Sequence, residues 1–312
     1  SISISFLVWK NIEEPFRDVN FVSNKYFLIL LSIGVALILI LSLSPLLPDK
    51  TLNSEYEKFN FSTDFQIMRE CFFENIPEDL VEIDQCMKPQ NGKKNILIVG
   101  SSVAQNIYKG LFDVEQSSLN FNLVAVTGCP PLLEKYDLNI PNFSENKCEV
   151  VYKQVNKNLL QNNYEKIIII YQWGDLLNIE VEEDNSFFDY TIESILQKVS
   201  KKNLLIIGQP VIWNTRLDIF AIRELNFKNS LDNYNSANIN ENIFDSEQQL
   251  KEKLSYLNIN SYSLIDFLCI DKQCLLYQIE NDKYFFTSSD FIHISDYFSQ
   301  KIGLDLLNRL EE

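Results

Sequence analysis

The chain has a single histidine, and its neighbours indicate a role in proton transfer. His293 stands three residues after Asp290, in the sequence Asp-Phe-Ile-His. An aspartate at this spacing can accept a hydrogen bond from Nδ1–H and orient the imidazole, so that Nε2 acts as a general base. The structural alternative is a turn that enters the next helix. Two other acidic residues at strand ends could orient the histidine, although we prefer to interpret them as solvated loop carboxylates: Asp175 and Asp266.

A serine at a strand end could supply the nucleophile. The apolar run 95–99 leads into Gly100, Ser101 and Ser102, and a helical pattern follows. A glycine allows a sharp turn after a strand. A serine at the start of a helix can stabilise an oxyanion with its own N–H and the helix dipole. The alternative is that Ser101 or Ser102 only caps the helix.

Two further strand ends carry residues that could contact a substrate. Gly128, ahead of Cys129 and two prolines, could offer a second N–H to the oxyanion, or could serve a rigid turn. Trp173 follows the run 167–171 and could pack on a sugar or form a wall of the crevice.

The elements that must position these residues follow an α/β pattern. Strands are predicted at 95–99, 122–126, 167–171, 204–207 and 262–267, with helices at 103–112, 148–162 and 295–310. Near-continuous apolar strands are typical of parallel sheets that are buried on both faces. The pattern predicts a three-layer fold with its functional crevice at the carboxyl ends of the strands. The Asn-rich stretch 216–257 is predicted to be an insertion.

Charge and hydropathy limit the partners. The net charge is −16, and all of it lies after residue 47, because residues 1–25 sum to zero and residues 26–47 are uncharged. A surface this negative repels phosphates, which argues against nucleic-acid binding. The apolar run 26–47 is long enough to cross a bilayer of roughly 30 Å as a helix, which predicts an anchor in the lipid bilayer. A buried core helix or a cleaved signal peptide fits less well, because the run has no polar stripe and 25 residues precede it.

All six cysteines lie after this run, and their even number favours disulfides in an oxidising compartment. Proximity in sequence suggests the pairs Cys71–Cys86, Cys129–Cys148 and Cys269–Cys274, with other connectivities left open. Reduced thiols in a cytosolic domain are the alternative. With one histidine and no Cys-x-x-Cys, we expect no metal site.

Several short motifs follow one another along the chain. They are Gly100-x-Ser102, Cys129-Pro130-Pro131 with Cys148, a strand ending at Trp173, Gly208-Gln-Pro210, Cys269 with Cys274, and Asp290-x-x-His293-Ile-Ser295. This order resembles the SGNH domain fused to the C-terminus of membrane acyltransferases of the acyltransferase-3 family. Residues 9–17 also resemble the signature that closes the membrane domain of those proteins.

The resemblance implies a flavodoxin-like α/β/α SGNH fold with a parallel sheet, preceded by one transmembrane helix. Residues 1–25 would be the remnant of the membrane acyltransferase domain, 26–47 the transmembrane helix, 48–92 a juxtamembrane linker and 93–312 the SGNH domain on the periplasmic or extracytoplasmic side. Such a protein is a membrane-tethered O-acyltransferase that modifies a cell-surface or secreted carbohydrate. The acyl group is expected to be acetyl. Acetyl-CoA would be used by the membrane domain, and no cofactor would be bound by this part.

Carried over from the family, Ser102 is the nucleophile, His293 the base and Asp290 its orienter, with Ser102, Gly128 and Trp173 at the oxyanion or substrate. The chain departs from the family at the serine, where Ser101 and Val103 replace the usual Asp and His. It also lacks the asparagine that commonly completes the oxyanion hole. A carbohydrate esterase with the same triad and a non-catalytic glycan-binding domain are therefore the alternatives.

Overall fold

The computed structural model describes residues 59–60, 71–131, 145–221, 223, 234–235 and 238–311, except 78–79, 115–117, 183–184 and 218. Its centre is a six-stranded sheet in which every neighbouring pair of strands is parallel. In spatial order the strands are β10 (Asn260–Tyr262), β8 (Leu204–Ile207), β5 (Lys166–Ile170), β3 (Lys94–Gly100), β4 (Leu119–Val126) and β2 (Phe72–Phe73).

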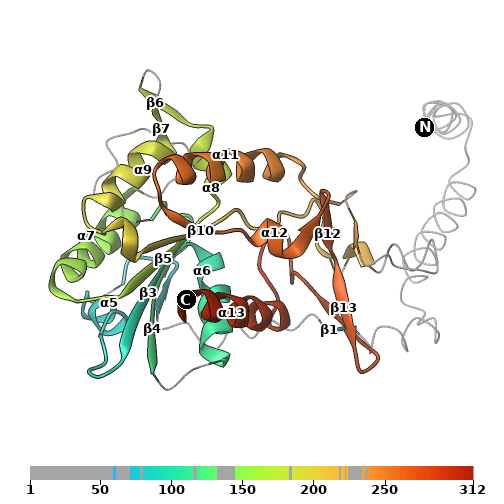
Figure 1. The fold of residues 1–312 in the computed structure, drawn as a ribbon, viewed down its shortest axis with the longest axis horizontal. Coiled ribbons are helices and arrows are strands. Elements are labelled where there is room, and N and C mark those ends of the chain that lie inside the picture. The colour runs from blue at the N-terminus through green and yellow to red at the C-terminus, as the bar shows by residue number, and fades with distance from the viewer. Residues whose placement is uncertain are drawn as a thin grey trace, which may run out of the picture. The chain divides into compact units, whose positions relative to one another are not determined.

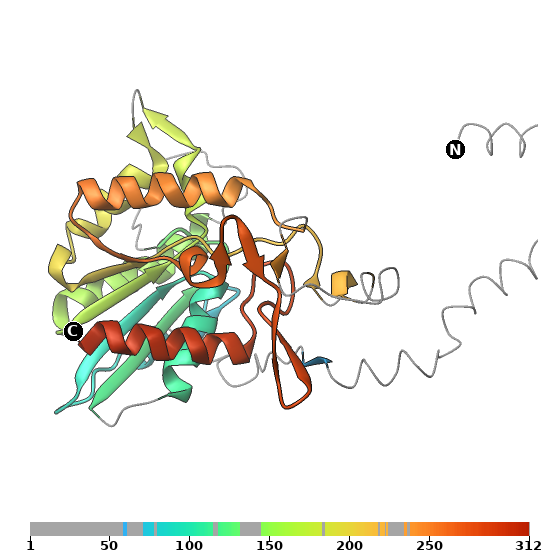
Figure 2. The same cartoon turned by 45° about the vertical axis from the view of Figure 1, so that its right-hand side comes forward.

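Helices cover both faces of this sheet (Figures 1 and 2). One face is covered by two long helices that pack side by side, α6 (Ser102–Asp113) and α13 (Asp296–Glu311), and by the short helix α12 (Leu264–Leu268). The opposite face is covered by α5 (Val81–Cys86), α7 (Glu145–Gln161), α8 (Trp173–Leu177), α9 (Phe187–Leu196) and the second half of α11 (Asn242–Tyr256). A short 3-10 helix, η4 (Lys201–Asn203), precedes β8. The predicted three-layer α/β/α fold with a parallel sheet is confirmed.

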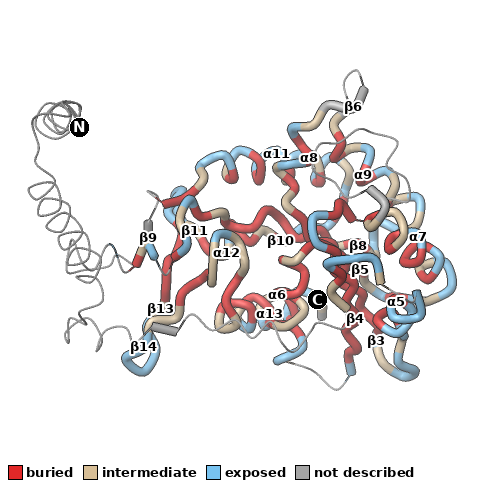
Figure 3. The backbone as a smooth tube through the Cα atoms, turned by 180° about the vertical axis from the view of Figure 1, so that it is seen from behind, coloured by how far each residue is buried: buried red, intermediate tan, exposed pale blue. Residues whose placement is uncertain are grey.

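Alternate residues of the central strands contribute to two apolar layers, one on each face of the sheet. Leu97 and Val99 belong to the layer under α7 and α9, whereas Ile96 and Ile98 belong to the layer under α6 and α13. Because both layers are closed, the central strands are buried along their length (Figure 3). This is why β3, β4 and β5 are continuously apolar in their carboxyl-terminal halves instead of alternating between apolar and polar residues.

The remaining short strands lie outside the six-stranded sheet. They form three small sheets: β1 (Phe59–Asn60) with β13 (Tyr277–Glu280) and β14 (Lys283–Phe286); β9 (Tyr234–Asn235) with β11 (Cys269–Ile270) and β12 (Gln273–Leu275); and β6 (Glu180–Glu182) with β7 (Asn185–Ser186). The three disulfides have the pairing suggested by proximity in sequence: Cys71–Cys86, Cys129–Cys148 and Cys269–Cys274.

One predicted strand was wrong in most of its length. Of the expected strand 262–267, only the first residue lies in β10, and the chain then turns into α12. The cause is local, because Ser263 caps the helix and its hydroxyl accepts a hydrogen bond from the Asp266 N–H at 3.0 Å. The apolar residues that follow it are spaced for a helix.

The sheet also begins earlier than expected. Strand β2 and helix α5, at 72–73 and 81–86, lie within the segment 48–92 that was predicted as a linker. The Cys71–Cys86 disulfide joins them, and Phe73 lies beside Val126 on β4. These residues therefore complete the edge of the sheet.

The run 26–47, predicted as a transmembrane helix, lies outside the described residues, as does the segment 1–25. Among the helices that the structure does describe, none has both the length and the apolar character needed to cross a membrane.

Candidate active site

Gly100 ends β3 at a point where a side chain could not fit. A Cβ at this position would lie 2.0 Å from the backbone oxygen of Ile170 on β5. The glycine therefore lets the two strands approach closely up to their carboxyl ends. Ser101 follows in extended backbone as the N-cap of α6, and Ser102 is the first helical residue. Ser101 therefore occupies the N-cap position, but its side chain makes no capping hydrogen bond. The Ser102 N–H lies outside the i→i−4 ladder of the helix.

The loop between β14 and α13 is folded around the Asp290 carboxylate. Its Oδ1 accepts hydrogen bonds from the N–H groups of Ile292 at 2.9 Å and His293 at 2.8 Å. The hydroxyl of Ser288 donates to the His293 carbonyl at 2.7 Å. Asp290 therefore fixes the backbone of the residue whose ring it also contacts.

The structure brings the three residues predicted as a triad into one chain of hydrogen bonds. Asp290 Oδ2 lies 2.6 Å from His293 Nδ1, and His293 Nε2 lies 2.8 Å from Ser102 Oγ. Ser102 and His293 are 191 residues apart in sequence. Their meeting follows from the parallel sheet, because the carboxyl ends of its strands share one edge.

The charge state of Asp290 determines the direction of these bonds. Partial burial of the carboxyl would raise its pKa, but hydrogen bonds from the His293 ring and from the Ile292 and His293 N–H groups outweigh this and lower the pKa to about 2. Asp290 is therefore ionised near neutral pH and accepts from Nδ1–H. This tautomer leaves Nε2 as the acceptor for the Ser102 hydroxyl.

Two glycines allow close packing between α6, which begins with Ser102, and α13, which follows the loop of Asp290 and His293. A Cβ on Gly110 of α6 would lie 1.8 Å from the backbone oxygen of Ser299 on α13, and one on Gly303 would lie 2.4 Å from the backbone of Gly110. The helix backbones are therefore in direct contact. Ser102 begins one of these helices, and His293 lies three residues before the other, so the contact fixes their separation.

Gly128 lies in a tight turn at the carboxyl end of β4, the strand beside β3. The Cys129 N–H donates to the Val126 carbonyl at 3.3 Å, and Gly128 has a φ of +69°. A positive φ at the third residue is the pattern of a type II turn, which requires glycine. A Cβ on Gly128 would meet no atom of the described residues within 4 Å. The Cys129–Cys148 disulfide ties the turn to α7.

Trp173 does not lie in the crevice, and its expected contact with substrate was wrong. Its side chain is 0% exposed, and its Nε1–H donates to the Ile207 carbonyl at 2.7 Å. The ring packs edge-on against Tyr171 and Phe188. The residue turns inward because α8 begins directly after β5 and directs this side chain into the layer under α9.

The other two acidic residues do not take the place of Asp290. Asp266 forms an ion pair with Lys251 at 2.6 Å. Asp175 is partly buried in α8, and this burial raises its pKa. Asp290 is the carboxylate bonded to His293 Nδ1.

A buried polar network follows the carboxyl end of β8, and the sequence analysis noted only its Gly208-Gln-Pro210 motif. The N–H of Gln209 donates to the Glu247 carboxylate at 2.7 Å, and the Gln209 side-chain oxygen accepts from the Gly174 N–H at 2.9 Å. Burial raises the pKa of Glu247. The same segment reaches the triad loop, since the Trp213 N–H donates to the Phe291 carbonyl at 2.8 Å. Glu247 lies on α11 among polar neighbours, so no local signal marks it as buried.

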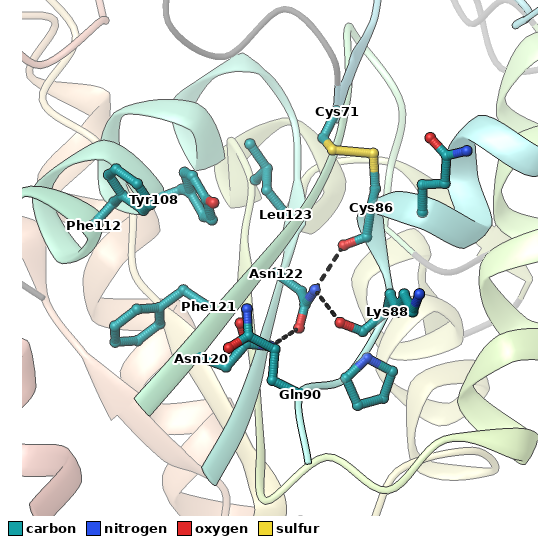
Figure 4. A pocket seen from close by; sticks show the side chains of 12 residues that line it. Cys71, Cys86, Lys88, Gln90, Tyr108, Phe112, Asn120, Phe121, Asn122 and Leu123 are labelled. Atoms are coloured by element: carbon teal, nitrogen blue, oxygen red, sulfur yellow. Dashed lines mark hydrogen bonds between the residues drawn. A yellow bond between two sulfur atoms is a disulfide. The ribbon is translucent and has the colours of Figure 1, made fainter. Parts of the chain in front are cut away.

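A cavity of about 520 Å³ lies along the outer side of β4, and none of the triad residues lines it. Figure 4 shows the amide of Asn122 reaching the carbonyls of Cys86 and Lys88, at 3.0 and 3.2 Å. Asn120 donates to the Asn122 side chain at 2.9 Å. These amides bond to one another and to the segment at the end of α5, so their role is structural.

Comparison with known proteins agrees with this fold. The periplasmic domain of a lipopolysaccharide acetyltransferase from Salmonella ser. Paratyphi A has a TM-score of 0.61 and 18% identity, over 78% of this chain and 92% of that chain. A GDSL-like lipase from Bacteroides thetaiotaomicron has a TM-score of 0.38 and 10% identity, over 74% of this chain and 96% of that chain. No curated protein matches the sequence. A family model described as the SGNH domain fused to AT3 domains matches residues 70–307, and the chain therefore belongs to this family.

Proposed function

We propose that this chain transfers an acyl group, expected to be acetyl, to a hydroxyl of a cell-surface or secreted carbohydrate. The observation that carries the proposal is the chain of hydrogen bonds from Asp290 through His293 to the Ser102 hydroxyl, at 2.6 and 2.8 Å. A serine, a base and an orienting carboxylate in this order are the components of covalent acyl transfer.

In the first half of the reaction, Ser102 Oγ attacks the carbonyl carbon of the acyl donor. Its proton passes to His293 Nε2, and the carbonyl oxygen becomes an oxyanion. The N–H groups of Ser102 and Gly128 are the donors available for this oxyanion at neighbouring strand ends. When the bond to the leaving group breaks, His293 returns the proton to that group, and an acyl ester remains on Ser102.

In the second half, the acceptor hydroxyl takes the place of the leaving group. His293 Nε2 removes its proton as its oxygen attacks the acyl ester, and a second oxyanion forms. The bond to Ser102 Oγ then breaks and Oγ regains a proton from His293, which restores the starting state. Ionised Asp290 stabilises the imidazolium that forms in each half.

Three lines support the class of acceptor and the compartment. The family model describes an SGNH domain fused to AT3 domains. The Salmonella structure of the same fold is named as a periplasmic domain that belongs to a lipopolysaccharide acetyltransferase. The three disulfides suit an oxidising compartment outside the cytoplasm. In this proposal a membrane AT3 domain supplies the acyl group from acetyl-CoA, and the glycan is the acceptor.

The test is product analysis with and without a carbohydrate acceptor. The chain is incubated with p-nitrophenyl acetate as donor and a lipopolysaccharide-derived oligosaccharide as acceptor. The mass of the oligosaccharide is then measured by mass spectrometry. We expect an acetylated sugar that is lost in Ser102→Ala and retained in Ser101→Ala, a matched serine whose side chain makes no capping bond. Free acetate alone, again dependent on Ser102, would identify an esterase. No reaction in either assay would identify a binding domain and refute the proposal.

A further inference from the structure

The turn that carries Gly128 is held from one side by a lysine. Lys147, in the first turn of α7, donates from Nζ to the carbonyl of Thr127 at 2.9 Å and to the carbonyl of Glu74 at 2.9 Å. The side chain is partly buried, and this burial lowers the pKa of the ammonium group. One cation therefore joins the chain after β2 to the turn after β4.

The Thr127 carbonyl and the Gly128 N–H belong to the same peptide unit. A trans peptide is planar, and its C=O and N–H point in opposite directions. No peptide bond in the described residues is cis. Because Lys147 holds the carbonyl, the N–H must point away from Lys147.

Lys147 and Ser102 belong to helices on opposite faces of the sheet. Helix α7 belongs to one face of the sheet, whereas α6, which begins with Ser102, belongs to the other. Strands β3 and β4 are neighbours, with Gly100 beside Ala125, so the turn and the serine lie at the same edge. Among the described residues, the Gly128 N–H has no acceptor, and no atom of theirs would lie within 4 Å of a Cβ placed on Gly128.

We propose that Lys147 is a positioning residue that keeps the Thr127–Gly128 peptide turned so that its N–H faces the oxyanion formed at Ser102. The inference rests on the proposed function, and it assigns to Lys147 a role that no motif in the sequence suggested. Without the ammonium, this peptide could rotate, because glycine accepts both orientations. The turn would then present a carbonyl oxygen to the oxyanion in place of a donor.

The matched pair of variants is Lys147→Met and Lys166→Met. Lys166 also donates from Nζ to a backbone carbonyl, that of Lys202 at 2.9 Å, but it lies at the amino end of β5. Lys166→Met therefore removes one lysine–carbonyl bond, of the same length as the two that Lys147→Met removes. Hydrolysis of p-nitrophenyl acetate by the full chain gives kcat and KM, and thermal unfolding reports the structural cost of each change.

We expect Lys147→Met to lower kcat by about tenfold to a hundredfold, short of or equal to the loss of one oxyanion donor. KM should change less than about twofold, because the oxyanion exists only in the transition state and intermediate. Lys147→Arg should recover most of the rate, and Lys166→Met should keep the original kcat. An unchanged kcat in Lys147→Met, or an equal fall in Lys166→Met, would overturn the inference.

A second measurement needs no variant and covers the case in which Lys147→Met does not fold. The chain has eight glycines, so isotope-labelled glycine gives a simple amide spectrum. Reaction of Ser102 with a fluorophosphonate places a phosphoryl oxygen at the oxyanion position, and the Gly128 amide proton should move downfield. If Ser102 reacts with the fluorophosphonate and the Gly128 amide proton resonance does not move, the role of Lys147 is overturned, but the proposed function is not. If Ser102 is not labelled and turnover does not depend on it, the proposed function fails and this inference fails with it.

Discussion

Replacing Gly110 with alanine should damage the triad more than it damages the fold. The added Cβ would lie 1.8 Å from the Ser299 backbone oxygen, whereas real Cβ contacts are essentially never closer than 3.0 Å. Helices α6 and α13 must therefore separate by at least about 1.2 Å at this contact. The hydrogen bond between Ser102 and His293, now 2.8 Å, connects the starts of these helices and would stretch beyond bonding range.

In Gly110→Ala, the loss of folding stability should be smaller than the loss of catalytic rate. Overpacking costs about 1–3 kcal/mol, but an alanine in a helix regains about 1 kcal/mol relative to glycine, so unfolding by urea should show a net loss of about 0–2 kcal/mol. A misplacement of 1 Å can cost about a hundredfold in rate, and we expect kcat for p-nitrophenyl acetate to fall by that order.

Two further variants bracket this prediction. Gly303→Ala should behave like Gly110→Ala, because its Cβ would lie 2.4 Å from the Gly110 backbone. Leu304→Ala, at the exposed neighbouring position of the same helix, should leave kcat unchanged. If Gly110→Ala keeps a kcat within about twofold of the original while folded, the helix contact does not set the triad distance and the reasoning fails.

Three other changes test separate parts of the structure. The Asp290 pKa of about 2, against an ordinary 3.8, predicts stability that is fully present above pH 3.8 and lost as the pH falls toward 2. Discounted because 33% of the side chain is exposed, this amounts to about 1–2 kcal/mol, so urea unfolding at pH 4.5 and 2.5 should show a larger loss in the original chain than in Asp290→Asn; equal losses would contradict it. Replacing both Cys129 and Cys148 with serine should lower the free energy of unfolding by about 2–5 kcal/mol, and an unchanged urea midpoint would speak against a stabilising bridge. Trp173→Ala should cost about 3–5 kcal/mol of stability with no change in acceptor KM, whereas a raised KM in a fully stable variant would return the residue to the substrate site.

The sheet and the triad could be predicted because their signals are local. Four of the five expected strands lie within β3, β4, β5 and β8 or differ by one residue, since strands buried on both faces are continuous apolar runs. Ser102, His293 and Asp290 were predicted as a triad from two short motifs, Gly-x-Ser and Asp-x-x-His, together with the family resemblance, and the structure joins them by hydrogen bonds. The topology of a parallel sheet was enough to bring those motifs to one edge.

What could not be predicted depends on contacts between distant segments. Trp173 follows a strand, and no periodicity tells whether such a residue faces the crevice or the core. Lys147 reaches a carbonyl 73 residues away, and Glu247 reaches Gln209 across 38 residues. Gly110 and Gly303 are ordinary helix residues until the two helices are placed together. The error at 262–267 is different, because the Ser263–Asp266 cap was a local signal that the apolar run outweighed.

The central claim is that Ser102 carries the acyl group, and acid-quenched peptide mapping tests it most directly. The chain is mixed with p-nitrophenyl acetate, stopped in acid within the first turnover, digested and analysed by mass spectrometry. We predict one acetyl group on the peptide that contains Ser102, present in Ser101→Ala and strongly reduced in His293→Ala, because Nε2 removes the serine proton. Acetyl groups scattered over surface lysines, or labelling of Ser102 that is unchanged in His293→Ala, would contradict the account.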